Sequence, residues 1–105
     1  MKSRAMVQVD DRRLELIEHP VPALPMGGAL LRVEACGLCG SDVAQFDGEL
    51  VRTGVVSYPV IPGHEPVGVI EDIHPEAQRL WDVKVGDRVA VEPHLSCGLC
   101  QSCLT

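Results

Sequence analysis

Aromatic residues are scarce in this sequence, and acidic residues outnumber basic ones. Phe, Tyr and Trp occur once each among 105 residues, so a core has to be built from Val, Leu, Ile and Ala, which suits β-sheets. The chain carries 9 Lys and Arg against 15 Asp and Glu, which gives a net charge of −6. Because binding to nucleic acid or to a membrane surface needs a basic patch, this balance argues against both kinds of partner.

Long apolar stretches and an export signal are also missing. No run reaches the roughly 18–20 residues that span a bilayer. The basic start over residues 1–4 leads into a stretch broken by charged residues, unlike a signal peptide. We therefore expect a cytoplasmic chain, and its length fits one domain over residues 1–105.

The chain has five cysteines, an odd number that cannot all pair within one chain. Thiols stay reduced where no export signal is present, so clustered cysteines favour metal binding or catalysis over disulfides.

The hydrophobic pattern predicts about five short strands and no long amphipathic helix. Residues 5–9 and 14–17 flank a polar turn and predict a hairpin, and the proline-rich stretch that follows predicts an extended connector. Over residues 29–36, Leu31, Val33 and Ala35 alternate with Arg32 and Glu34, so we expect one face of this strand to be buried, and Cys36 on the same strand to be a packing residue. Further strands are expected at 67–73 and 89–91.

The segments between these strands carry turn signals. After the glycine-rich turn that follows residue 36, Ser41 or Asp42 is expected to cap a short helix over 43–46. Gly68 marks a place where a side chain would obstruct packing. Elsewhere we expect a loop over 47–57, a helical turn or a loop over 75–81, and a cysteine-rich loop over 92–105. The pattern predicts an all-β fold, either a small barrel or paired sheets.

Three cysteines near the C-terminus have the spacing of a metal site. Cys97, Cys100 and Cys103 follow a C-x2-C-x2-C pattern, and structural zinc takes four tetrahedral ligands, most often thiolates. We interpret this group as a zinc site; an iron–sulfur cluster and ordinary buried cysteines are the alternatives. Only three ligands are present, so the fourth is expected beyond Thr105, at His94 or from water.

A second group of candidate ligands lies in the middle of the chain. Cys39 follows a strand, and His64 precedes another within a Pro-Gly-His-Glu-Pro turn; catalytic zinc typically keeps three protein ligands and one open position. Asp42 and Glu65 are placed to support them, since a metal-bound histidine usually donates its other N–H to a carboxylate. The spacing leaves alternatives open: Cys39 as a core residue and His64 as a hydrogen-bonded turn residue. Cys36 and Cys39 also have the spacing of a thioredoxin-like redox pair, but that motif is expected in a βαβ unit, and none is visible.

The order of four motifs resembles a known family. The motifs are Cys-Gly-Leu-Cys39-Gly-Ser41-Asp42, Pro-Gly-His64-Glu65-Pro-Val-Gly68, Gly86-Asp-Arg-Val89 and the C-terminal cysteines. Together they resemble the N-terminal part of the zinc-dependent medium-chain alcohol dehydrogenases over nearly the whole chain. The Val-Ala-Val-Glu92-Pro93 stretch resembles the polyol and threonine dehydrogenase branch.

The resemblance implies a GroES-like, partly open β-barrel with short helical turns. It implies that Cys39 and His64 bind a catalytic zinc, with Glu65 as a supporting group or an alternate ligand. Ser41 would pass the proton of the alcohol away from the zinc, and Asp42 would orient His64. The C-terminal cysteines would bind a structural zinc.

The reaction that the resemblance implies is oxidation of an alcohol or polyol by hydride transfer to NAD or NADP. Zinc would act as a Lewis acid that lowers the pKa of the alcohol, and the nicotinamide would accept the hydride. A homo-oligomer is expected for the full-length enzyme.

The sequence departs from the family pattern in three respects. The fourth structural cysteine and the third catalytic ligand would lie beyond residue 105, and no G-x-G-x-x-G dinucleotide motif occurs. Ala44 stands where many relatives carry a histidine of the proton relay. We therefore expect a truncated catalytic domain that is inactive alone. A stand-alone zinc-binding module with the same barrel, and a chaperonin-like barrel with incidental cysteines, are the alternative interpretations.

Overall fold

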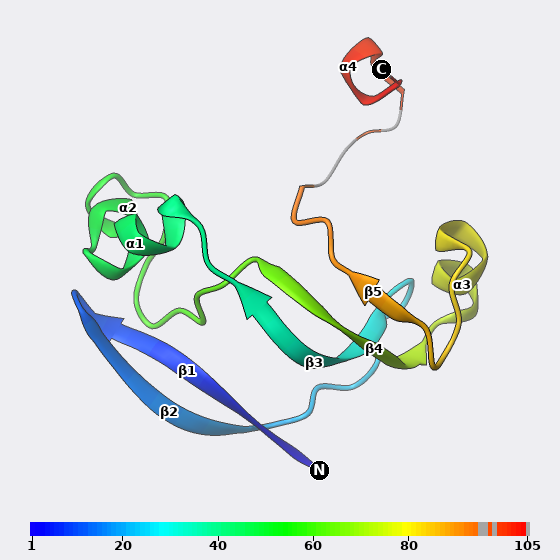
Figure 1. Cartoon of the computed structure of the whole chain (residues 1–105), viewed down its shortest axis with the longest axis horizontal. Helices are drawn as coiled ribbons and strands as arrows, with labels where there is room; N and C mark the ends of the chain where they lie inside the picture. Colours follow the sequence, from blue (N-terminus) through cyan, green and yellow to red (C-terminus); the bar gives the residue numbers. More distant parts are fainter. Residues whose placement is uncertain (95–96, 98, 105) are drawn as a thin grey trace.

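The computed structural model describes residues 1–94, 97 and 99–104, and its strands form two open antiparallel sheets (Figure 1). The first sheet pairs β1 (Lys2–Asp10) with β2 (Arg13–Pro20). In the second, β4 (Glu65–Ile73) lies between β3 (Ala29–Gly37) and β5 (Arg88–Ala90). The predicted hairpin and the predominance of strands are confirmed.

Short helices connect or follow the strands (Figure 1). They are α1 (Gly40–Phe46), α2 (Glu49–Arg52), α3 (Pro75–Trp81) and α4 (Gln101–Leu104). Among the residues that the structure describes, no helix has the length and apolar character needed to cross a membrane. The segment over 75–81, for which the sequence left a turn or a loop open, is a helix. The expected loop over 92–105 contains α4, and residues 95, 96, 98 and 105 lie outside the described residues.

Two local predictions around α1 were wrong. The N-cap of α1 is Cys39 rather than Ser41 or Asp42, and Asp42 binds back to the cap from the third helical position. The expected loop over 47–57 contains α2, which is a single turn entered through Gly48 at φ +84°. A helix of one turn is too short to produce a periodic pattern of apolar residues, so it could not be predicted from periodicity.

The burial predicted along β3 is confirmed for Leu31, which is partly buried against the core, and was wrong further along the strand. Val33 is 56% exposed, and Ala35 and Cys36 are exposed as well. The described core lies beside the other end of this sheet, where Ile70, Ile73 and Ala77 are buried. The alternation of β3 was read correctly as a strand, but no described segment covers the apolar side chains at its C-terminal end.

The described chain is more open than a complete domain of its mass. Its accessible surface is 7884 Å², whereas a folded protein of this mass exposes roughly 5,700 Å². Its radius of gyration is 15.7 Å, against about 13 Å for a compact domain of this length. The excess surface indicates that the two sheets do not enclose a continuous core by themselves.

Gly68 allows β3 and β4 to approach each other closely. A Cβ atom built on Gly68 would lie 2.2 Å from the carbonyl oxygen of Arg32 in β3. Across this central strand, Arg88 of β5 donates two hydrogen bonds to the carboxylate of Glu34 in β3, at 2.8 and 3.2 Å. These bonds hold the pKa of Glu34 below its usual value. The predicted packing role of Gly68 is confirmed.

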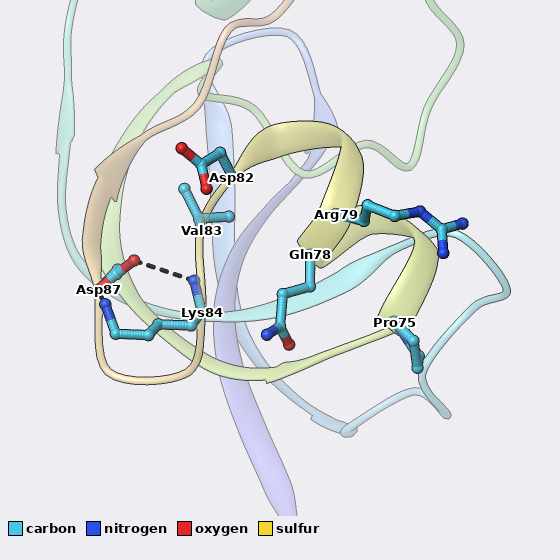
Figure 2. A pocket seen from close by; sticks show the side chains of 7 residues that line it. All are labelled: Pro75, Gln78, Arg79, Asp82, Val83, Lys84 and Asp87. Atoms are coloured by element: carbon cyan, nitrogen blue, oxygen red, sulfur yellow. Dashed lines mark hydrogen bonds and ion pairs between the residues drawn. The ribbon is translucent and has the colours of Figure 1, made fainter.

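The Gly86-Asp-Arg-Val89 motif forms the turn that leads into β5. Gly86 adopts φ +94°, and the carboxylate of Asp87 accepts bonds from the backbone N–H of Lys84 at 2.9 Å and from its ammonium at 3.1 Å. These two bonds, in that order, hold the pKa of Asp87 below its usual value. The turn borders a surface hollow of about 470 Å³ beside α3 (Figure 2). The motif therefore has a structural role here.

Candidate metal centre

The antiparallel pairing of β3 and β4 brings the middle group of candidate ligands together. Gly37, the last residue of β3, pairs with Glu65, the first residue of β4. Cys39 follows β3 directly and His64 precedes β4, so both lie at the same end of the sheet. One ligand atom each of Cys39, His64 and Glu65 lies within 4.8 Å of the others. We call these three residues the middle cluster.

The contacts of Cys39 point toward a shared centre. Its Sγ lies 3.3 Å from Nε2 of His64 and 2.9 Å from Oγ of Ser41. Cys39 and His64 are partly buried, whereas Glu65 is exposed. The cluster is therefore reachable from outside while two of its donors are held by the protein.

Asp42 supports both of these donors. Its Oδ2 accepts a hydrogen bond from the backbone N–H of Cys39 at 2.9 Å, and its Oδ1 lies 3.6 Å from Nδ1 of His64. Its side chain is only 12% exposed. The carboxylate therefore lies on the side of Nδ1, where the supporting group of a metal-bound histidine normally stands, while Nε2 of His64 faces Cys39.

Gly63 sets the position of His64. Its φ of +100° is a left-handed conformation that glycine adopts without strain. A Cβ atom at this position would also lie 3.0 Å from Sγ of Cys36. Cys36, which was expected to be a packing residue, is instead an exposed thiol next to the turn that carries His64.

The three C-terminal cysteines also converge, and we call them the C-terminal cluster. Sγ of Cys103 lies 3.6 Å from that of Cys97 and 3.3 Å from that of Cys100. The backbone N–H groups of Leu99 and Cys100 donate to Sγ of Cys97, each at 3.4 Å. These bonds, with the neighbouring thiols, lower the pKa of Cys97 to about 7. The thiolate form that a metal needs is therefore favoured.

His94 does not join the C-terminal cluster in the part of the chain that the structure describes. Its side chain is 88% exposed, and its Nδ1 lies 2.8 Å from the carboxylate of Glu92. The backbone N–H of His94 donates to the same carboxylate. This agrees with the interpretation of His94 as a surface histidine, and the expectation of a ligand beyond Thr105 lies outside the described residues.

Both donor sets fit zinc. Thiolate, imidazole and carboxylate are the groups that bind this ion in proteins, and a site with cysteine ligands alone is typical of structural zinc. The middle cluster mixes all three donor types, and its exposed carboxylate leaves one side open. That arrangement suits an ion that exchanges one ligand.

A buried polar pair between β1 and α1 was missed in the sequence. Gln8 of β1 and Gln45 of α1 are 0% and 5% exposed, and Nε2 of Gln45 donates to Oε1 of Gln8 at 2.9 Å. Glutamine is usually found at the surface, so neither residue stood out. A polar residue at position 8 between apolar neighbours is the one signal that was available.

The open β-structure, together with two clusters of zinc-type donors, defines a class of protein: a metal-binding domain built on strands. A sequence profile of the alcohol dehydrogenase GroES-like domain matches residues 25–105. The chain therefore belongs to the alcohol dehydrogenase GroES-like domain family, as the four motifs indicated, and its predicted all-β, GroES-like fold is confirmed.

Curated relatives are alcohol and polyol dehydrogenases. A probable alcohol dehydrogenase of Mycobacterium tuberculosis is 46% identical over 100 residues, which cover 95% of this chain and 26% of the relative. D-altritol 5-dehydrogenase of Agrobacterium fabrum is 45% identical over 95 residues, or 90% of this chain and 26% of the relative. The chain thus spans about a quarter of the length of the relatives it matches.

Solved structures show the same fold. A thermostable alcohol dehydrogenase of Pyrobaculum aerophilum with bound cobalt and zinc superposes with a TM-score of 0.77 at 31% identity, covering 99% of this chain and 30% of that one. An alcohol dehydrogenase of Escherichia coli, described as short-chain and complexed with NADH, superposes with a TM-score of 0.77 at 31% identity, covering 98% and 28%.

Proposed function

We propose that this chain is the N-terminal part of the catalytic domain of a zinc-dependent alcohol dehydrogenase. The enzyme oxidises a small alcohol or a polyol and transfers hydride to NAD or NADP. The observation that carries the proposal is the convergence of Cys39, His64 and Glu65, with Ser41 and Asp42 in contact with the same group.

In this proposal Cys39 and His64 hold the catalytic zinc, and Glu65 is a supporting group or an alternate ligand. The ion, when bound, supplies Lewis acidity that lowers the pKa of the alcohol. Asp42 keeps the ring of His64 oriented and binds the backbone of Cys39. Oγ of Ser41, 2.9 Å from Sγ of Cys39, takes the proton of the alcohol and passes it toward solvent.

The C-terminal cluster has a different role in the proposal. We assign Cys97, Cys100 and Cys103 to a structural zinc, because a site with thiolate ligands alone is typical of structural zinc. The zinc would order a segment that has little apolar content of its own. A fourth ligand is supplied by residues beyond those described.

The remaining parts of the enzyme are proposed to lie in a longer polypeptide. The excess surface of roughly 2,000 Å² relative to a compact domain supports further chain that packs on these sheets. A dinucleotide-binding domain is needed for the cofactor, since residues 1–105 contain no G-x-G-x-x-G motif. We propose a cytoplasmic homo-oligomer without nucleic-acid or membrane partners, in line with the net charge of −6.

The test uses the full-length protein that contains this chain. Reduction of NAD and NADP is measured with a panel of simple alcohols and polyols, for the wild type and for Cys39→Ser. Cys36→Ser is the matched control, because Cys36 is an exposed thiol three residues away that lies outside the middle cluster. We expect Cys39→Ser to abolish turnover and Cys36→Ser to preserve it.

Turnover of Cys39→Ser near the wild-type rate would contradict the proposal. Absence of turnover with every alcohol in the wild type, together with intact zinc at the C-terminal cluster, would favour a zinc-binding module that shares the fold.

A further inference from the structure

One buried glutamine joins the two chain segments that lead to the proposed catalytic ligands. Gln8 in β1 is 0% exposed and is the largest fully buried side chain in the described part of the molecule. Burial of an amide is unfavourable unless hydrogen bonds replace those to water, so the partners of Gln8 show what it holds in place. Apart from the carbonyl oxygen of Asp10 in its own strand, 3.2 Å from Nε2, they lie on α1, whose N-cap is Cys39, and on the segment before His64.

The side chain of Gln8 binds the C-terminal end of α1. Its Nε2 lies 3.0 Å from the carbonyl oxygen of Gln45 and 3.1 Å from that of Phe46, and it donates to both. Its Oε1 accepts from Nε2 of Gln45 at 2.9 Å. A helix leaves its last carbonyl groups without partners inside the helix. The carbonyl oxygen of Gln45 also accepts from the N–H of Gly48 at 3.0 Å and that of Phe46 from the N–H of Arg12 at 2.7 Å, so Gln8 adds a second bond to each.

Helix α1 is also attached to the hairpin through Arg12, whose N–H donates to the carbonyl oxygen of Phe46 at 2.7 Å and whose guanidinium lies 5.2 Å from the Phe46 ring, but the helix buries no apolar side chain. It is seven residues long, which is too short for a helix to be stable in water without tertiary contacts. Gln45 is its one buried residue, whereas Val43 is 63% exposed. A polar pair therefore docks this helix where an apolar stripe normally would. Because the helix is roughly 10 Å long, a shift at Phe46 is carried directly to Cys39.

The backbone of Gln8 binds the segment that leads to His64. Its N–H donates to the carbonyl oxygen of Val60 at 2.8 Å, and its carbonyl oxygen accepts from the N–H of Val60 at 3.0 Å. Nε2 of Gln8 also lies 3.2 Å from the hydroxyl of Tyr58. The two-way pair with Val60 stands four residues before His64.

We propose that Gln8 is a positioning residue that sets the distance between Cys39 and His64 and so the geometry of the catalytic zinc site. The inference rests on the proposed function for the identity of the metal, and on the hydrogen bonds of Gln8 for the positioning. Without its amide, α1 loses its side-chain bonds to β1 and keeps the backbone bond from Arg12, while Val60 keeps its backbone pairing with residue 8. The distance between Cys39 and His64 is then no longer fixed.

The test compares zinc release from the two clusters of the full-length protein. Gln8→Met keeps the length of the side chain and removes its hydrogen bonds. We expect a chelator to remove zinc from the middle cluster about tenfold faster than in the wild type, the lower end of what supporting residues contribute to metal affinity. Release from the C-terminal cluster should keep the wild-type rate, which provides an internal control. The visible spectrum of cobalt placed in the middle cluster should change as well.

Two further variants separate positioning from general destabilisation. Val7→Ala removes a buried apolar side chain from the same strand, on the opposite face, and should lower stability without changing zinc release from the middle cluster. Gln45→Met leaves the bonds from Gln8 to the two carbonyl groups and should give a smaller acceleration. If Gln8→Met does not fold, Gln45→Met and Val7→Ala decide the question. Wild-type release in both glutamine variants, or equal acceleration by Val7→Ala, overturns the proposal.

A measurement without metal keeps this proposal distinct from the proposed function. Amide hydrogen exchange is followed in the metal-free protein over residues 40–46 and 60–64. Faster exchange over residues 40–46 in Gln8→Met, with wild-type exchange over 60–64 and no change in Val7→Ala, supports positioning by Gln8 even if the wild type binds no zinc at the middle cluster. Unchanged exchange overturns it, whatever the metal content.

Discussion

Replacement of Gly68 by alanine tests whether close approach of β3 and β4 holds the site together. The added Cβ atom would lie 2.2 Å from the carbonyl oxygen of Arg32 and 3.0 Å from Cα of Val33. An ordinary carbon–oxygen contact is about 1 Å longer. Because both neighbours are backbone atoms, the clash cannot be relieved by rotating a side chain, and the strands have to separate.

We expect Gly68→Ala to lower the free energy of unfolding by about 3 kcal/mol or more, the upper range for an overpacked interior. This is a large part of the roughly 5–15 kcal/mol that stabilises a typical protein. Gly40→Ala is the matched control. No atom lies within 4 Å of its added Cβ and its φ is not positive, so alanine in α1 should be neutral or stabilise by roughly 0.5–1 kcal/mol.

The assay is urea unfolding of the full-length protein, with the two variants and the wild type side by side. Zinc content is measured on the same samples. Since the pairing of β3 with β4 brings Cys39 next to His64, Gly68→Ala should lose zinc from the middle cluster before the C-terminal cluster. Stability of Gly68→Ala within about 0.5 kcal/mol of the wild type, the usual range of harmless surface changes, would refute this reasoning.

Two further predictions concern the contacts of Asp11, at the tip of the hairpin, with Gly48 and with Tyr58. Gly48→Ala should lower the free energy of unfolding more than Gly54→Ala, as measured by urea unfolding. Both glycines have positive φ, but only at position 48 would the added Cβ lie against the carboxylate of Asp11, 2.1 Å away. Equal losses of unfolding free energy in the two variants would contradict this contact. Burial and then the hydrogen bond to Asp11 raise the pKa of Tyr58 to about 12 from 10.0. The neutral phenol is therefore favoured in the folded state, so its contribution to stability is present below pH 10 and is lost as the pH rises from 10 toward 12. The difference in tyrosinate absorbance between wild type and Tyr58→Phe measures this titration, and a midpoint near 10 would contradict the buried contact.

Much of the fold was predictable from local signals. The hairpin was predicted because a polar turn separates two apolar runs, and its partner strands pair over nearly their whole length. Gly68 was expected to mark a tight contact and does so. The grouping of Cys39 with His64 and Glu65 followed from motifs at the ends of strands, and the β3–β4 pairing brings them together.

The failures have a common physical cause, which is that burial depends on what covers a residue. Val33 and Ala35 carry the alternation of a half-buried strand, yet no described segment lies over them. Gln8 and Gln45 show the opposite error. Their side chains are polar and were not considered for the interior, but Nε2 of Gln45 bonds Oε1 of Gln8 and Nε2 of Gln8 bonds the end of α1. Oε1 of Gln45 is buried without a hydrogen-bond partner in the described part of the chain. The pairing of Gln8 with Gln45 joins residues 37 positions apart and leaves no local pattern.

The metal content of the full-length protein tests the central claim most directly. Zinc is measured after purification in the wild type, in the double variant Cys39→Ser/His64→Ala and in Cys97→Ser. The account predicts one zinc ion at each cluster in the wild type, loss of only the first in the double variant, and loss of the second with reduced stability in Cys97→Ser. Zinc content that stays at the wild-type value in both variants would contradict the assignment of these residues as ligands.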